Sequence, residues 1–84
     1  MALPSKPVTL TPEQLGELNR KLSTMRHDIN NNLSLIMAAV ELVRHKPQMV
    51  EKMMATLGEQ PAKISDSLTR FSADFETAFG ITRP

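Results

Sequence analysis

The chain has 84 residues, a net charge of +1 and no cysteine, and its acidic and basic residues are mixed along its length. A chain this short forms one domain with a modest core, disulfides and thiolate metal sites are excluded, and the balanced charge indicates no binding to nucleic acid. No stretch has the roughly 20 apolar residues of a membrane-spanning helix, so we expect a cytoplasmic protein without membrane insertion. Because the core is small and disulfides are excluded, we also expect the chain to complete its core by self-association.

The first ten residues are expected to form a flexible leader, because Pro4 and Pro7 interrupt regular structure. This leader also lacks the apolar run of a signal peptide. The next four residues, Thr11-Pro12-Glu13-Gln14, are typical of a helix start: the threonine caps, the proline occupies the first helical position, and the glutamine can close a capping box. We predict a first helix over 12–45.

Apolar residues of the first helix repeat every seven positions, as in helices that pack along a seam. One row is Leu15, Leu22, Ile29, Ile36 and Val43, and the other is Leu18, Met25, Asn32 and Ala39. Beyond Asn32 the apolar face widens, which favours burial on more than one side, as in a bundle.

Lys46-Pro47 predicts a tight turn, because the residue before a proline disfavours helical geometry and proline suits a first turn. A second helix is predicted over 47–79, kinked near 58–61 by Gly58 and Pro61. Its rows are Val50, Leu57, Ile64, Phe71 and Ala78, and Met54, Pro61, Leu68 and Phe75. Gly80 is a stop signal, and residues 81–84 form a tail.

The predicted fold class is therefore all-α, with residues 11–80 forming an antiparallel two-helix hairpin. Two helices cannot cover both of their apolar stripes by themselves. Pairing two hairpins into a four-helix bundle would cover them, so we expect a homodimer.

A polar block interrupts the first helix between Arg26 and Leu33. If Ile29 occupies heptad position a, His27 occupies position f, which is the most exposed. Asn31 then lies about 40° and Asp28 about 100° around the helix from this histidine. A neutral imidazole is a nucleophile, and a carboxylate bonded to one ring nitrogen raises the electron density of the other, which can attack a phosphoryl group.

The segment RHDINNNL, residues 26–33, resembles the H-box of the dimerisation and histidine-phosphotransfer domain of bacterial sensor histidine kinases, especially the variant H-D-x-N-N-x-L. The resemblance implies that His27 is the phosphoacceptor, that Asp28 is the acid that activates it, and that Asn31 serves phosphatase action or orientation. Many members carry a proline where this chain has Asn32. We therefore expect the bend of the first helix to be replaced by one at Pro61 in the second.

The resemblance also implies the partners: a histidine-kinase catalytic domain as donor and a response-regulator receiver domain as acceptor. The chain contains no ATP-binding motif, so no cofactor is expected on it, and ATP with Mg²⁺ would act only through a catalytic domain in trans or missing from this chain. No metal site is predicted. The residues expected to contact a partner are Arg20, Ser23, Thr24, Ser34, Ala38, Ser67 and Arg70.

Simpler interpretations remain open. His27 could be an ordinary surface histidine, and Asp28 could form an exposed ion pair with Arg26 or Lys21, which would contribute little. Asn32 lies on the seam, where one buried asparagine can specify register and oligomeric state. The alternative function is a non-enzymatic helical dimerisation or adaptor module.

Overall fold

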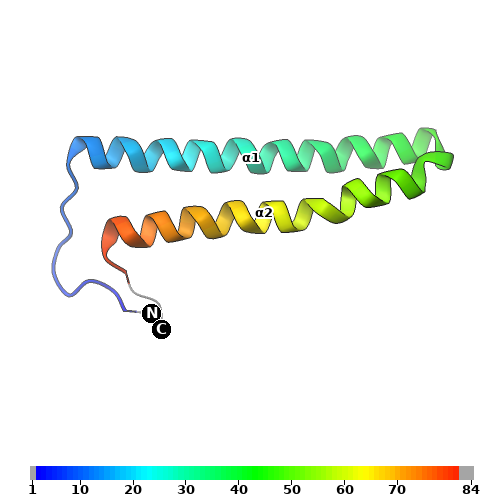
Figure 1. Cartoon of the computed structure of the whole chain (residues 1–84). Helices are drawn as coiled ribbons and strands as arrows, with labels where there is room; N and C mark the ends of the chain where they lie inside the picture. The colour runs from blue at the N-terminus through cyan, green and yellow to red at the C-terminus, as the bar shows by residue number, and fades with distance from the viewer. Residues whose placement is uncertain (1, 82–84) are drawn as a thin grey trace.

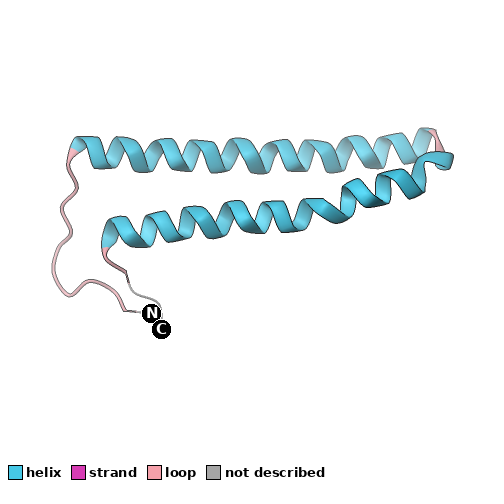
Figure 2. Cartoon of the chain, viewed as in Figure 1, coloured by secondary structure: helices cyan, strands magenta, loops and turns pink. Residues whose placement is uncertain are grey.

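The protein is an all-α helical hairpin. The structure, a computed structural model, describes residues 2–81, so the leader's Met1 and residues 82–84 of the predicted tail lie outside the described part. Helix α1 spans Pro12–His45, a short 3₁₀ turn η1 spans Pro47–Met49, and helix α2 spans Val50–Phe79. The two long helices lie side by side and antiparallel (Figures 1 and 2).

The start of α1 is closed by the capping box that the sequence predicts. The hydroxyl of Thr11 accepts a hydrogen bond from the backbone N–H of Gln14 at 3.1 Å, and the Gln14 side chain accepts one from the N–H of Thr11 at 2.8 Å. Both bonds satisfy backbone donors that a helix start leaves without partners. The other end closes where the N–H of Lys46 donates to the carbonyl of Leu42 at 2.7 Å, just before Pro47.

The second helix begins three residues later than expected, because Pro47–Met49 forms the tighter 3₁₀ turn before α2. It ends at Gly80, whose φ of +67° is left-handed. The N–H of Ile81 donates to the carbonyl of Glu76 at 2.9 Å, which satisfies an unpaired carbonyl of the last turn.

Pro61 lies inside α2 without ending it. Proline has no N–H, so the carbonyl one turn before it loses its helical partner. Figure 1 shows α2 changing direction in its green-to-yellow part, whereas α1 runs straight beside it.

The face of each helix toward the other is more polar than the sequence pattern suggests. Among the described residues, Ala39 is the one buried apolar side chain, while the polar Asn32, Gln60 and Ser67 are also buried. The first predicted row of α2 is turned inward and half-buried at Leu57, Ile64, Phe71 and Ala78. The second row stays outside, and its place between the helices is taken by Gln60 and Ser67.

One side of the hairpin is an apolar stripe open to solvent. Leu15, Leu33 and Val40 lie within about 20° of one direction around α1 at 100° per residue, with 57%, 45% and 44% of their surface exposed. The second row of α2 continues the stripe at Met54, Leu68 and Phe75, and Val50 of the first row joins it; each is at least 40% exposed. Phe75 also contacts Phe79, with ring centroids 4.6 Å apart.

The hairpin is a single layer of helix. Its extents are 58 × 29 × 12 Å, and 12 Å is about the diameter of one helix with its side chains. Its accessible surface is 6486 Å², whereas a compact protein of 9.4 kDa exposes about 5,000 Å². The difference is enough surface to form one side of a stable interface. Among the described residues no helix is long and apolar enough to cross a membrane.

Candidate functional site

His27 lies on the solvent-facing surface of α1, near the middle of its length. Its side chain is exposed, as the heptad position predicts. The helix around it is straight and uninterrupted (Figure 1), so its backbone is held by regular helical bonding. The other histidine, His45, is also exposed but lies in the last turn, where its Nε2 is 3.4 Å from a carboxylate oxygen of Glu41. The imidazole of His27 is open to an incoming reagent.

Asp28 faces a different direction from His27. It is half-buried, and it lines the groove between the two helices. No hydrogen bond joins the two side chains, and neither of the ion pairs that the sequence allowed, with Arg26 or with Lys21, forms within the described residues. The carboxylate would have to move outward from the groove to reach the imidazole.

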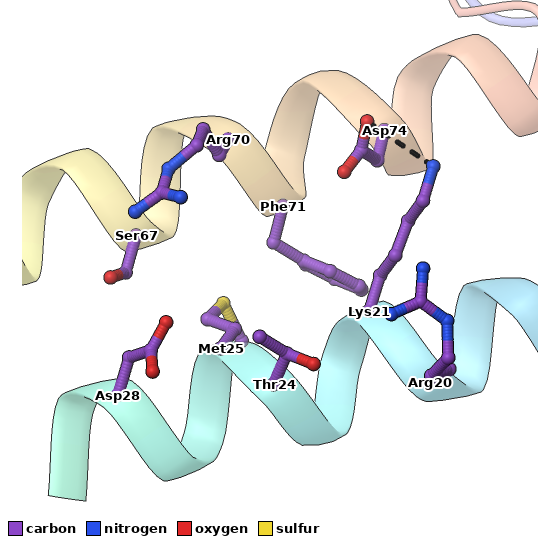
Figure 3. Close-up of a pocket in the computed structure, with 9 residues that line it drawn as sticks. All are labelled: Arg20, Lys21, Thr24, Met25, Asp28, Ser67, Arg70, Phe71 and Asp74. Carbon is purple, nitrogen blue, oxygen red and sulfur yellow. Dashed lines mark ion pairs between the residues drawn. The ribbon is translucent and has the colours of Figure 1, made fainter. Parts of the chain in front are cut away.

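The groove beside Asp28 forms a hollow of about 210 Å³. Figure 3 shows it open between α1 below and α2 above, with charged side chains on both walls and the ring of Phe71 between the helices. The residues that line it are Arg20, Lys21, Thr24, Met25, Asp28, Ser67, Arg70, Phe71 and Asp74. The hollow is therefore polar at its rim and apolar at its floor.

A second hollow of about 220 Å³ lies further along the same groove. Asn31, which the sequence assigns to the site, lines this second hollow and is exposed. Asp28, Ser67 and Arg70 line both hollows. The rest of the lining comes from Asn32, Lys63 and Asp66. The structure thus brings Asp28 and Asn31 to the groove and leaves His27 outside its lining.

Most cations of the groove already have a carboxylate partner. Lys21 reaches across to Asp74, with 3.6 Å between Nζ and Oδ1, and Lys63 lies 3.9 Å from Glu59. Arg20 donates to Glu17, and this hydrogen bond, with the attraction of the two charges, lowers the pKa of the Glu17 carboxyl. Arg70 is the remaining cation of the lining, and within the described residues it forms no ion pair or hydrogen bond.

The residues predicted to contact a partner fall into two environments. Six of them are exposed: Arg20, Ser23, Thr24, Ser34, Ala38 and Arg70. Ser67 is only 5% exposed and lies between the helices, at the border of the two hollows. A partner on the surface would therefore reach Ser67 only through the groove.

Sequence reasoning missed Lys21, Phe71 and Asp74 as members of this groove. A signal for them existed, because residues of an antiparallel hairpin pair so that their numbers have a constant sum. The residue numbers of the ion pair Lys21 and Asp74 add up to the same value as those of Asp28 and Ser67. The second pair therefore lies one heptad further along the hairpin than the first. Applying this rule requires the turn to be placed within one residue.

Other chemistry finds little support in the described residues. No cluster of three histidine, aspartate or glutamate side chains there could hold a metal ion. Within residues 2–81, Gln60 is the one buried side chain with an unsatisfied polar atom: its Nε2 donates to the carbonyl of Thr56 at 2.9 Å, while its Oε1 has no partner. This oxygen lies inside the hairpin, away from the exposed histidine face.

No protein-family model matches the chain, and no curated protein or solved structure matches it.

Proposed function

We propose that the chain is a histidine phosphotransfer module of two-component signalling, in which His27 accepts a phosphoryl group and passes it to an aspartate of a receiver domain. The observation that carries the proposal is the exposure of His27 on a straight helix beside a polar groove. An imidazole nitrogen in this position can attack a phosphoryl group without any rearrangement of the fold.

The groove supports a role for the two neighbouring side chains. Asp28 is close enough in sequence to turn outward and bond one ring nitrogen of His27, which would fix the tautomer and strengthen the other nitrogen as nucleophile. The amide of Asn31 lies one turn from His27 and could orient the phosphoryl group or an attacking water. The predicted receiver surface is this flank of α1 together with the facing part of α2.

The same proposal includes a homodimer. The apolar stripe lies on the side of the hairpin away from the groove, because Asp28 is about 140° around α1 from Leu33 and Arg70 is about 160° around α2 from Leu68. A second copy that packs its stripe on this one would bury the apolar side chains. Both grooves and both copies of His27 would remain accessible in that four-helix bundle.

The decisive experiment is to incubate the purified protein with a kinase catalytic domain, a phosphorylated receiver domain, or phosphoramidate as a small phosphoryl donor. We expect one acid-labile phosphoryl group per chain, on His27. The variant His27→Ala should lose the label, and His45→Ala is the matched control because His45 is also exposed. Label that persists in His27→Ala would refute the assignment.

A second candidate is a non-enzymatic helical dimerisation or adaptor module. Two observations favour it: the open apolar stripe, and the buried polar side chains of Asn32 and Gln60, which can specify register. This candidate predicts a dimer that no donor labels. Labelling by phosphoramidate therefore separates the two functions without knowledge of the natural partner.

A further inference from the structure

Asp28 lies between two possible partners. On one side, about 100° around α1, is the exposed imidazole of His27. On the other side is the groove, into which the carboxylate extends in the present structure (Figure 3). The direction in which Asp28 points decides whether it can strengthen His27 as a nucleophile.

Several charges face Asp28 from both helices. From α1 they are Arg20 and Lys21, and from α2 they are Lys63, Asp66, Arg70 and Asp74. Lys21 is occupied by Asp74, Lys63 by Glu59 and Arg20 by Glu17. Arg70 alone among these cations has no carboxylate partner in the described residues, and it lines both hollows on either side of Asp28.

Arg70 and Asp28 enter the same groove from opposite helices. Figure 3 shows its guanidinium extending from α2 toward Ser67, while Asp28 rises from α1 into the same space. The Lys21 and Asp74 pair, one heptad away, shows that a long cation can bridge this groove, with 3.6 Å between its atoms. An arginine offers several donors in a rigid fork that matches a carboxylate. The attraction between the two groups favours the inward position of Asp28.

We propose that Arg70 is a positioning residue that holds the Asp28 carboxylate in the groove and away from His27. The free hairpin then presents a less reactive imidazole. A partner that places an acidic side chain in the groove binds Arg70 in place of Asp28, and the released carboxylate turns outward to His27. This inference builds on the proposed function, since it gives the phosphoacceptor a resting state and an active one.

The test measures the reactivity of His27 without any phosphoryl donor. Diethyl pyrocarbonate carbethoxylates neutral imidazole, and at about pH 8 an ordinary histidine is neutral. The rate at each histidine is followed by mass spectrometry of its peptide, with His45 as the internal reference in the same chain. We expect Arg70→Gln to raise the rate at His27 about threefold, because a carboxylate bonded to the ring increases electron density at the attacking nitrogen.

Three further variants make the result specific. In an Asp28→Asn background the change Arg70→Gln should have no effect, because the coupling passes through that carboxylate. Arg70→Lys keeps the positive charge and should restore the slow rate. Lys63→Gln is the matched control, since Lys63 lines the second hollow but is paired with Glu59, and its rate should stay at that of the parent chain.

The inference is overturned if Arg70→Gln leaves the rate at His27 unchanged or lowers it. It is also overturned if the increase persists without the Asp28 carboxylate, because the effect would then be a general one of charge. Failure of the phosphotransfer proposal has a different signature: no donor labels His27, while the coupling of Arg70 to Asp28 can still be measured. Helicity by circular dichroism confirms that each variant keeps the fold.

Discussion

His27, Asp28 and Asn31 lie within about one turn of α1 and yet occupy three environments. The histidine is open to solvent, the aspartate is half-buried in the groove, and Asn31 is exposed at the edge of the second hollow. Neighbouring residues of a helix point about 100° apart, so adjacency in sequence does not place two side chains in contact. Under the proposal above, Asp28 acts on His27 only when its carboxylate leaves the groove and bonds the imidazole instead.

Gln60 provides a test of the polar interior. Its Oε1 is buried without a hydrogen-bond donor, and an unsatisfied buried acceptor is costly. We expect Gln60→Leu to increase the free energy of unfolding by about 1 kcal/mol, measured by urea denaturation at fixed protein concentration. Gln48→Leu, at an exposed position in the turn, is the control and should change little. A destabilised Gln60→Leu would mean that a donor reaches this oxygen in the folded protein.

Both ends of α1 and the end of α2 were predictable for local reasons, whereas the start of α2 was placed three residues too early. Thr11 and Gln14 act through hydrogen bonds to each other, and Pro47 disfavours helical geometry at the residue before it. Helix α1 accordingly occupies the range expected for it. The packing face of α2 was less predictable, because two apolar rows compete for it. The pairing of the helices turns Leu57 and Ile64 inward and leaves Leu68 outside, and this choice depends on contacts that a single helical pattern does not contain.

The same limit applies to the candidate site. The exposure of His27 follows from its heptad position, which is a property of α1 alone. The meeting of Asp28 with Arg70 and Ser67 depends on the turn bringing two distant segments together. The motif around His27 therefore pointed to this histidine as a candidate, but the groove and its unpaired arginine required the paired helices.

Gly58 inside α2 and Gly80 at its end should respond in opposite ways to substitution. Gly58 lies inside the helix with open space around it, and Gly80 ends the helix at a φ of +67°. We expect Gly58→Ala to stabilise the protein by about 1 kcal/mol, because alanine is the better helix former. Gly80→Ala should destabilise it by about 1 kcal/mol, because an L side chain is strained in the left-handed region. Thermal unfolding followed by circular dichroism measures both, and equal signs would contradict the assigned end of α2.

The extended shape of the hairpin favours association. The Cα radius of gyration is 18.1 Å, whereas a compact chain of this length has about 12 Å. The excess reflects the length of the two helices and the single layer that they form. A homodimer through the apolar stripe would give the hairpin the second layer that helical domains require.

Sedimentation at micromolar concentration tests this assembly. We expect a dimer for the parent chain and a weakening of about 100-fold for Leu68→Glu, because the substitution places a charge in an apolar interface. Leu3→Glu is the matched control, since Leu3 is a 70% exposed leucine outside the helices. A parent chain that sediments as a monomer would contradict the dimer, and an equal loss in both variants would place the interface elsewhere.

The thickness of the hairpin, only 12 Å, has a consequence for its stability in a cell. If most of its stabilisation comes from a second copy, the folded fraction depends on how much protein is synthesised, because association follows mass action. A scarce chain would be exposed to proteases, and an abundant one would persist. Gene dosage would thereby set a concentration below which little folded protein persists.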